Sequence, residues 1–288
     1  MENKKLKLGA IMVIIAAIMW GLDGVVLTPN LTNLPVPFVV FLLHCVPFVF
    51  MSVFFYKEFK VIKNFKKDHI IIFSLIAIFG GAVGTISIVK ALFLVNFEHL
   101  SIVVLLQKLQ PIFSIILARI LLKEKLGKNF IVWTLFALIA VYLLTFGFNL
   151  PSSNSSNISL AAFYSILAAF SFGSSTVFGK YIMNIYDYKT VTFYRYGFTT
   201  LFMIVFLTMT KGFVPISYIT KTNWIILLII TFTTGAGAIA LYYYGLKFIN
   251  AKISTICELA FPLSTVVFDY LIHGNKMSTI QWISAGIL

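Results

Sequence analysis

Apolar stretches close to the roughly 20 residues that cross a bilayer as a helix recur along this chain, and they constrain its fold more than any single motif. Of the 288 residues, 60% are hydrophobic and only 11% are charged. Soluble domains average about 45–50% apolar and about 25% charged residues. Too few polar residues remain here to cover a water-facing surface. The chain is therefore predicted to be an all-α integral membrane protein.

Ten helical spans fit the sequence, five in each half. They are expected at about 8–27, 35–56, 69–92, 99–122, 127–147, 158–181, 189–210, 222–246, 252–273 and from 278 onward. A polar linker at 148–157 separates a first repeat, 1–147, from a second, 158–288. The first span lacks a small-x-small cleavage site, so we expect a retained helix rather than a signal peptide. The tenth span ends at Leu288 and is expected to be a truncated helix.

The basic residues predict the orientation of these spans. With the N-terminus inside, 16 of the 22 Lys and Arg residues lie on the inner side. Two more lie within spans (Lys108 and Arg195), and four lie outside (Lys90, Lys211, Lys221 and Lys276). Cytoplasmic loops carry such an excess of basic residues, so a multi-pass cell-membrane protein with a cytoplasmic N-terminus is predicted. The same asymmetry accounts for the net charge of +13, and no nucleic-acid partner is expected.

The two halves share a sequence pattern. Trp20-Gly21 recurs 152 residues later as Phe172-Gly173, whereas Pro111 and Gly84 recur 151 residues later as Pro262 and Gly235. Because each half has an odd number of spans, the second repeat is expected to be inverted in the bilayer. The prolines and glycines are candidate structural or hinge positions. Close helix packing is favoured over substrate contact for the glycines.

The combination of these motifs resembles the EamA family of the drug/metabolite transporter superfamily. The resemblance rests on Trp20-Gly21, on Pro111 followed by Glu124, on their counterparts in the second half, and on the runs 243–248 and 258–262. It implies ten helices and the carriage of small metabolites, commonly the export of amino acids or related compounds. Two positions depart from it: Asn275 replaces the second acidic residue, and His44 occupies the repeat position of Arg195.

Ionisable residues inside predicted spans mark candidate binding positions, because a charge at the bilayer centre costs about 2.5–3.5 kcal/mol on insertion scales. They are Asp23, His44, Lys108, Arg195, Glu258 and Asp269. Depths along continuous helices predict an inner pair of Arg195 with Glu258 and an outer pair of Asp23 with Lys108. The same depths argue against a direct bridge from Lys108 to Glu258. His44 is placed between the pairs, and Asp269 near the outer interface.

Two interpretations of these charges remain open. They can be structural ion pairs that fix helix packing, or they can surround a polar cavity that binds a zwitterionic solute. In the second case Arg195 would hold a carboxylate, and Glu258 would meet an ammonium group or carry a coupling proton. His44 would be a protonation switch, or simply a hydrogen-bonded buried histidine. Aromatic residues that could form the cavity wall are Trp20, Tyr194, Tyr242, Tyr243 and Tyr244, although packing and lipid contact are equally compatible with them.

The sequence predicts a secondary-active carrier that exports a small polar metabolite by alternating access, with an amino acid or related compound as the expected substrate. Proton coupling is a hypothesis that rests on Glu258 and His44. An intramembrane enzyme acting on a lipid-linked substrate is disfavoured, because the acidic residues are scattered without metal-ligand spacing. A non-transporting membrane partner protein is a third alternative. No metal or cofactor is expected, and the oligomeric state is left open.

Overall fold

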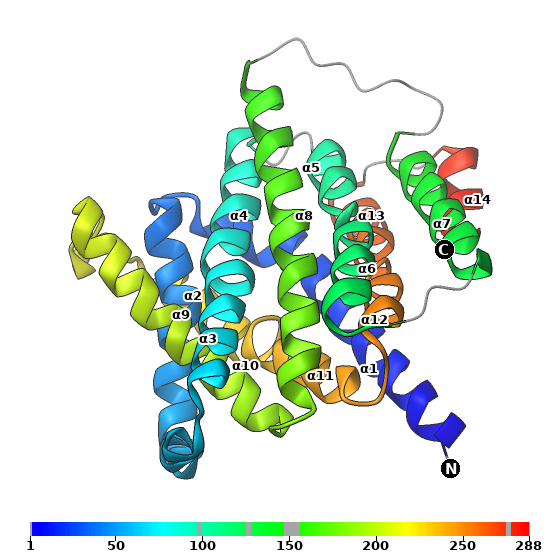
Figure 1. Cartoon of the computed structure of the whole chain (residues 1–288). Coiled ribbons are helices and arrows are strands. Elements are labelled where there is room, and N and C mark those ends of the chain that lie inside the picture. Colours follow the sequence, from blue (N-terminus) through cyan, green and yellow to red (C-terminus); the bar gives the residue numbers. More distant parts are fainter. Residues whose placement is uncertain (1, 97–99, 125–127, 147–155, 275–277, 288) are drawn as a thin grey trace.

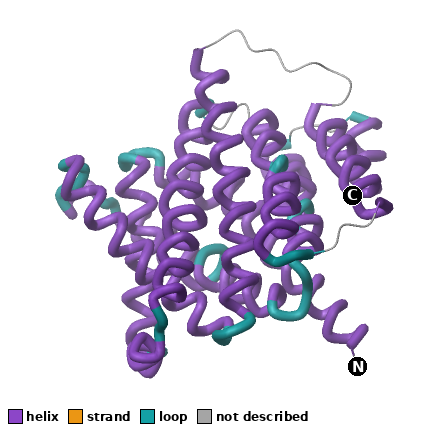
Figure 2. Tube along the Cα trace, viewed as in Figure 1, coloured by secondary structure: helices purple, strands orange, loops and turns teal. Residues whose placement is uncertain are grey.

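The computed structural model describes residues 2–96, 100–124, 128–146, 156–274 and 278–287. Within this described part of the chain every regular element is a helix (Figure 2). Asn275, Leu288 and most of the predicted linker at 148–157 lie outside the described residues. The elements are α1 (Glu2–Leu22), η1 (Asp23–Leu27), η2 (Thr28–Leu31), α2 (Val36–Phe54), η3 (Tyr56–Asn64), α3 (Lys67–Leu75), η4 (Ile76–Val83), α4 (Gly84–Leu94), α5 (Leu100–Gln107), α6 (Gln110–Leu121), α7 (Lys128–Phe146), α8 (Ser156–Met183), α9 (Tyr188–Thr210), η5 (Ile216–Tyr218), α10 (Lys221–Phe232), α11 (Ala236–Leu246), α12 (Ala251–Cys257), α13 (Ala260–His273) and α14 (Thr279–Ile287).

Within the residues that the structure describes, seven helical stretches are long and apolar enough to cross a membrane. They are Asn3–Leu31, Val36–Phe54, Lys67–Leu94, Asn157–Met183, Tyr188–Thr210, Lys221–Leu246 and Ala251–His273. The spans predicted at 99–122, 127–147 and from 278 onward fall on α5 with α6, on α7 and on α14, which are not among the seven. The chain is a multi-pass helical membrane protein, and the count of ten spans stays a prediction.

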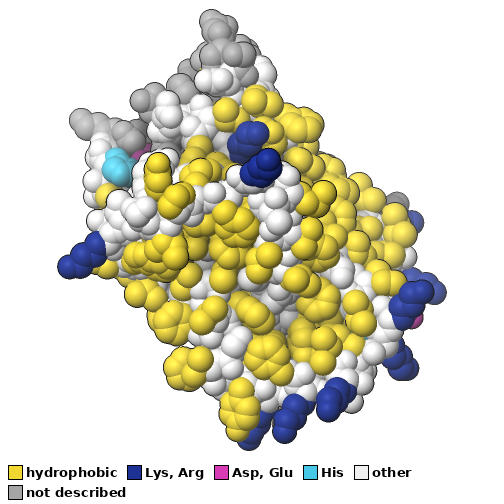
Figure 3. Space-filling model, turned by 90° about the vertical axis from the view of Figure 1, so that its left-hand side faces the viewer, with side chains coloured by type: hydrophobic (Ala, Val, Ile, Leu, Met, Phe, Trp, Pro, Cys, Tyr) yellow, Lys and Arg dark blue, Asp and Glu magenta, His cyan; other side chains and the backbone are white. Residues whose placement is uncertain are grey.

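The outer surface of the bundle is apolar, as lipid contact requires. Large hydrophobic side chains are widely exposed, including Met209 at 80% and Leu271 at 68%. Figure 3 shows hydrophobic side chains covering one face, with Lys and Arg at its edges. Contiguous apolar surface of this extent is rare on soluble proteins and marks the region that faces the hydrocarbon.

Among the described residues, several helix pairs make extensive contacts, and the pair at one side of the bundle is α7 with α14 (Figure 1). Helix α1 packs on α11 and α13, and helix α8 packs on α4 and α6. Helix α2 packs on α9, and α7 packs on α14. The core is therefore built mainly between elements of the first and second halves of the chain.

Glycines allow the closest of these approaches. A Cβ added to Gly9 would lie 2.7 Å from the Gly245 carbonyl oxygen, so α1 and α11 meet backbone to backbone. A Cβ on Gly21 would collide with the Ser264 hydroxyl, and one on Gly173 would lie 2.8 Å from the Gln110 carbonyl oxygen. Small residues let membrane helices pack at such distances.

Several spans are interrupted near the middle of the bundle. Helix α1 continues as a π-helical turn from Asp23, and η4 is a π-helical segment inside the third span. The helical stretch of α5 and α6 breaks between Gln107 and Gln110, and that of α12 and α13 breaks between Cys257 and Ala260. Irregular backbone is tolerated at membrane depth only where it is buried in protein or lines a cavity.

Candidate functional site

A cavity of about 210 Å³ lies where these interrupted helices meet. It is lined by Trp20, Asp23, Gly24, Thr28, Leu43, His44, Thr85, Ile88, Val89, Leu92, Gln107, Lys108, Gln110, Phe172, Ser175, Thr176, Arg195, Tyr196, Ile230, Thr234, Gly235, Ile239, Tyr242, Glu258 and Phe261. The wall combines aliphatic and aromatic surface with many polar and charged side chains, and converging polar groups on an apolar wall are a feature of small-molecule sites.

Breaks in the helices place the charged groups of the wall. Asp23 begins the π-helical turn, Lys108 lies in the break after α5, and Glu258 lies in the break after α12. Broken helices of this kind form the substrate sites of many transporters. Pro111 is near the start of α6, and Pro262 is the third residue of α13, so both prolines follow a break directly.

Glu258 is the centre of a buried polar network. The Gln110 amide donates a hydrogen bond to its Oε2 atom, and the Ser254 hydroxyl donates to Oε1 at 3.1 Å. Ser254 also lies 3.4 Å from the Tyr242 hydroxyl. A buried carboxylate needs such donors, because an uncompensated charge in a low-dielectric interior is expensive.

Lys108 and Glu258 lie on the same cavity wall and influence each other's charge electrostatically, without an ion pair shorter than 4 Å among the described residues. The Lys108 ammonium group also lies 3.9 Å from the centre of the Phe261 ring, in cation–π geometry. The predicted pairing of Lys108 with Asp23 is not found, because in the described part of the chain no carboxylate oxygen of Asp23 or of Glu258 lies within 4 Å of the Lys108 ammonium nitrogen. That prediction measured depth along unbroken helices, and the two breaks change where these side chains lie.

Arg195 is held by neutral groups. Its guanidinium donates to the Ser175 hydroxyl at 3.3 Å, to the Tyr243 hydroxyl at 3.1 Å and to the Gly80 carbonyl at 2.8 Å. The predicted inner ion pair with Glu258 is wrong in this conformation, because the guanidinium fork is already occupied by these three acceptors. Its Nε atom is buried without a hydrogen-bond partner among the described residues.

Two further ionisable residues contribute to the wall. Asp23 lies beside Thr28 and Thr234, and its Oδ1 atom is buried without a hydrogen-bond partner in the described part of the chain. His44 donates from Nδ1 to the Val40 carbonyl at 2.8 Å, and its ring lies 5.3 Å from that of Tyr196. The His44 side chain is thus a hydrogen-bonded buried histidine that also faces the cavity.

Aromatic residues surround the cavity, but only part of the predicted set does so. Trp20 and Tyr242 line it with ring centres 5.5 Å apart. Tyr194 and Tyr243 were predicted as wall residues and are absent from the lining. Tyr194 instead donates to the Glu58 carbonyl at 2.8 Å, and Tyr243 is fully buried beneath Arg195. The Tyr194 side chain is directed at η3, away from the cavity that Arg195 and Tyr196 line.

The candidate hinge glycines both lie at backbone irregularities. Gly84 follows the π-helical segment and packs on Phe172, where an added Cβ would lie 2.8 Å from the ring. Gly235 lies in the break between α10 and α11, and its amide donates to the Ile230 carbonyl at 2.6 Å. Gly235 also lines the cavity.

Sequence reasoning missed several polar and aromatic members of the wall. They are Gln107, Gln110, Phe172, Ser175, Thr176, Tyr196, Thr234 and Phe261. Gln107 could have been found, because it stands 151 residues before Glu258. Its Oε1 atom is buried without a hydrogen-bond partner among the described residues. Uncharged side chains carry no comparable penalty inside a membrane, so the search for charges did not select them.

Among the described residues no group of three or more His, Cys, Asp or Glu side chains could hold a metal ion.

Comparison with known proteins identifies the family of this chain. Residues 7–146 and 159–288 match the model of the EamA-like transporter family. A protein named riboflavin transporter ImpX, from Fusobacterium nucleatum subsp. nucleatum, is 55% identical over 279 residues, which cover 96% of this chain and 93% of that protein. A crystal structure with a TM-score of 0.67 and 12% identity shares the fold over 99% of this chain and 93% of its own. The chain therefore belongs to the EamA-like transporter family, and it is a membrane transporter rather than an enzyme.

Proposed function

We propose that this chain carries riboflavin across the membrane through the central cavity. The observation that supports this most is its 55% identity, over nearly the whole chain, to a protein named as a riboflavin transporter. No finding supports the amino-acid substrate expected from the sequence, and riboflavin replaces it in this proposal. Export was the expected direction and is retained as a prediction.

The chemistry of the cavity wall suits riboflavin. The vitamin has a flat aromatic ring system, an edge that donates and accepts hydrogen bonds, and a flexible chain of hydroxyl groups. Trp20, Phe172 and Tyr242 offer aromatic surface for the ring system. Gln107 and Arg195 present a buried acceptor and a buried donor for its polar edge.

The formal charges of the wall also suit an uncharged solute. Asp23 and Glu258 are balanced by Lys108 and Arg195, so the cavity has no excess of either sign. A neutral ligand adds no charge to a low-dielectric site, whereas a free phosphate or carboxylate would.

The cavity must widen to accept this solute. Its volume of about 210 Å³ is below the roughly 300–1,000 Å³ typical of sites for drug-sized ligands. We propose that widening accompanies alternating access, with the helix breaks as the places where the spans bend.

We further propose ten spans arranged as two inverted repeats, 1–147 and 158–288. If residues are exchanged by the repeat shift, α1 becomes α8, α4 becomes α11 and α6 becomes α13. The contact of α1 with α11 then becomes that of α8 with α4, and the contact of α1 with α13 becomes that of α8 with α6; all four contacts are present. The breaks after Gln107 and Cys257 are also related by nearly the same shift.

The orientation and coupling belong to the same proposal. The distribution of basic residues supports a cytoplasmic N-terminus in the cell membrane. The buried Lys108–Glu258 network, with His44 on the same cavity, is the proposed route for coupling protons.

Counterflow in proteoliposomes tests the substrate directly. Vesicles loaded with unlabelled riboflavin should take up labelled riboflavin from outside, without any ion gradient. Unlabelled competitors should separate the parts of the ligand: lumichrome carries the ring system alone, ribitol the chain alone, and alanine represents the earlier expectation. Riboflavin should compete best. Uptake that alanine drives and riboflavin does not would refute the proposal.

A further inference from the structure

The connection between α2 and α3 is an unusually long 3₁₀ helix. Segment η3 covers nine residues, Tyr56–Asn64, whereas 3₁₀ runs beyond 3–4 residues are uncommon. With three residues per turn, positions i, i+3 and i+6 share one face. The sequence Tyr-Lys-Glu-Phe-Lys-Val-Ile-Lys-Asn therefore separates into three faces of different chemistry.

One face of η3 is fastened to the protein. The Glu58 carboxylate accepts a hydrogen bond from the Thr190 hydroxyl at 2.7 Å, and the Glu58 carbonyl accepts one from the Tyr194 hydroxyl at 2.8 Å. Val61, one turn later, packs against the central hydrophobic core. Glu58 is thus turned toward α9 and is not placed to neutralise the lysines of η3.

A second face is apolar and exposed. Tyr56, Phe59 and Ile62 are 59%, 49% and 47% exposed. Phe59 contacts Phe193 with its inner edge, at a ring distance of 4.9 Å. Aromatic and aliphatic side chains in such positions favour the boundary between lipid headgroups and acyl chains.

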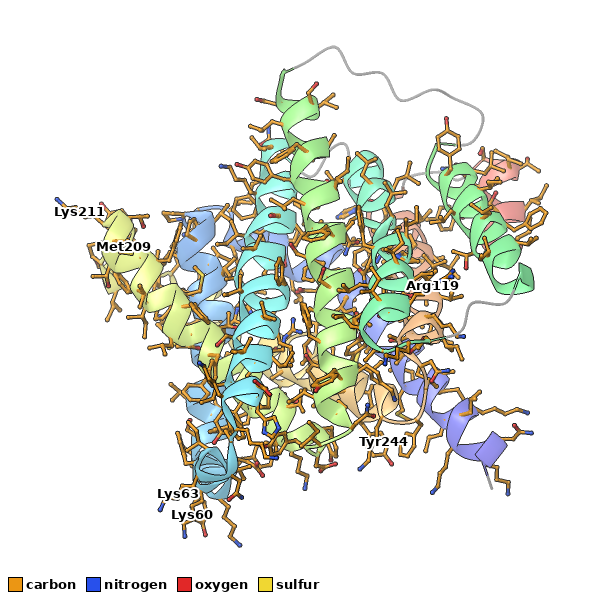
Figure 4. The ribbon with its side chains drawn as sticks, in the orientation of Figure 1. Lys60, Lys63, Arg119, Met209, Lys211 and Tyr244 are labelled. Carbon is orange, nitrogen blue, oxygen red and sulfur yellow. The ribbon has the colours of Figure 1, made fainter. Side chains whose placement is uncertain are left out.

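The third face is basic. Lys57, Lys60 and Lys63 follow one another at three-residue spacing, and all three are exposed. Figure 4 shows Lys60 and Lys63 projecting from one end of the bundle. Lys66 and Lys67, also exposed, extend this charge to the start of α3.

We infer that η3 is a binding strip for anionic phospholipid headgroups in the leaflet at this end of the bundle. An apolar face beside a lysine face, on a helix that lies at the end of the spans, is the arrangement by which interfacial helices bind acidic lipid. The apolar face would rest on the acyl boundary while the three lysines hold phosphate oxygens. The anchoring through Glu58 keeps both faces directed outward.

The experiment compares lipids retained by the full-length protein. The protein is reconstituted in mixed phosphatidylcholine and phosphatidylglycerol vesicles and extracted gently, and the bound lipids are quantified by native mass spectrometry. The K57Q/K60Q/K63Q variant removes the basic face. The K4Q/K5Q/K7Q variant is the matched control, because it removes the same charge from exposed lysines of α1.

Wild-type protein should retain phosphatidylglycerol in preference to phosphatidylcholine. In the η3 variant the ratio of bound phosphatidylglycerol to bound phosphatidylcholine should fall at least about fivefold, which is the factor expected for one lysine near an anionic surface. The control should keep it, and K57R/K60R/K63R should restore it, which excludes misfolding as the cause. Equal loss in the η3 variant and the control, or no preference in wild type, would overturn the inference.

Discussion

Two broken helical stretches of this transporter have similar backbones and different chemistry. The first ends α5 at Gln107 and resumes as α6 at Gln110, and the second ends α12 at Cys257 and resumes as α13 at Ala260. A proline follows each break, Pro111 in one and Pro262 in the other. The first break supplies Gln107 and Lys108 to the cavity, whereas the second supplies Glu258.

The comparison shows that the backbone of a break belongs to the framework, whereas its side chains set the chemistry of the candidate site. The break itself needs only a proline and a partner helix that tolerates irregular backbone. The side chains at the break decide whether the cavity receives a neutral amide, a cation or an anion. Effects of substitution should therefore differ between the two breaks, even though their backbones are alike.

The largest effect is expected at the second break. Glu258→Gln removes the buried negative charge that acts on the buried Lys108. If the two residues behave as a buried charge pair, removing one partner should cost about 3–5 kcal/mol of stability. Riboflavin counterflow should fall at least about 100-fold, and the remaining transport should no longer respond to a pH gradient. Thermal unfolding in detergent measures the loss of stability, and counterflow in proteoliposomes measures the loss of transport.

A double variant sharpens the test. Glu258→Gln with Lys108→Met removes both charges and should recover part of the lost stability. Asp269→Asn, also in α13 but outside the cavity lining, is the control. If the double variant is less stable than Glu258→Gln alone, the two residues are not partners.

Substitution of Arg195 should have the second-largest effect, because Arg195 joins the cavity to α8, η4 and α11. Arg195→Lys keeps the charge and loses the planar fork that reaches Ser175, Gly80 and Tyr243. Riboflavin affinity should fall about 10- to 100-fold, at about 1.4 kcal/mol per tenfold. Arg119→Lys, at an exposed position, should leave affinity unchanged. Equal affinity of the two variants would remove Arg195 from the site.

A smaller effect is expected at the first break. Gln107→Leu removes a buried amide that has an unpartnered oxygen, at similar volume. Riboflavin binding should weaken about two- to tenfold, the range for one hydrogen bond of about 0.5–1.5 kcal/mol. Ser114→Ala removes another unpartnered buried oxygen, which lies outside the cavity lining. Quenching of riboflavin fluorescence on binding measures the affinity of both variants. If Ser114→Ala weakens riboflavin binding as much as Gln107→Leu does, Gln107 does not contact the ligand.

Trp20 should show the smallest change in affinity. Trp20→Leu keeps an apolar wall and loses mainly the aromatic contact. Because leucine still packs there, the loss should lie near the low end of about 0.5–1.5 kcal/mol, so binding should weaken about threefold. Quenching of riboflavin fluorescence should fall as well, because an indole no longer lies beside the ring system. Trp224→Leu, in α10 and outside the lining, is matched to it. Unchanged quenching in Trp20→Leu would place the ring system elsewhere.

The candidate site was predictable from the sequence where charge inside an apolar span reveals a residue. Asp23, His44, Lys108, Arg195 and Glu258 were all selected in this way, and the structure brings them to one cavity together with Trp20. Their role in binding remains a prediction. Neutral members such as Gln110 and Thr234 leave no comparable signal, because the cost of burying them is low once they are hydrogen-bonded.

The pairing of these charges could not be predicted. A depth scale of 1.5 Å per residue assumes an uninterrupted helix, and the helical stretches that carry Lys108 and Glu258 are both interrupted. The directions of neighbouring tyrosine side chains were also predicted wrongly. Tyr194 and Tyr243 are buried against other helices and do not line the cavity, whereas Tyr242 does.

Sequence alone determined that this is a helical membrane protein of a transporter family, because hydrophobic length and the order of motifs are properties of the chain itself. Only the tertiary structure decided which polar groups meet. Their partners depend on where helices break and how closely small residues let them pack, and those outcomes arise from contacts between the two halves of the chain.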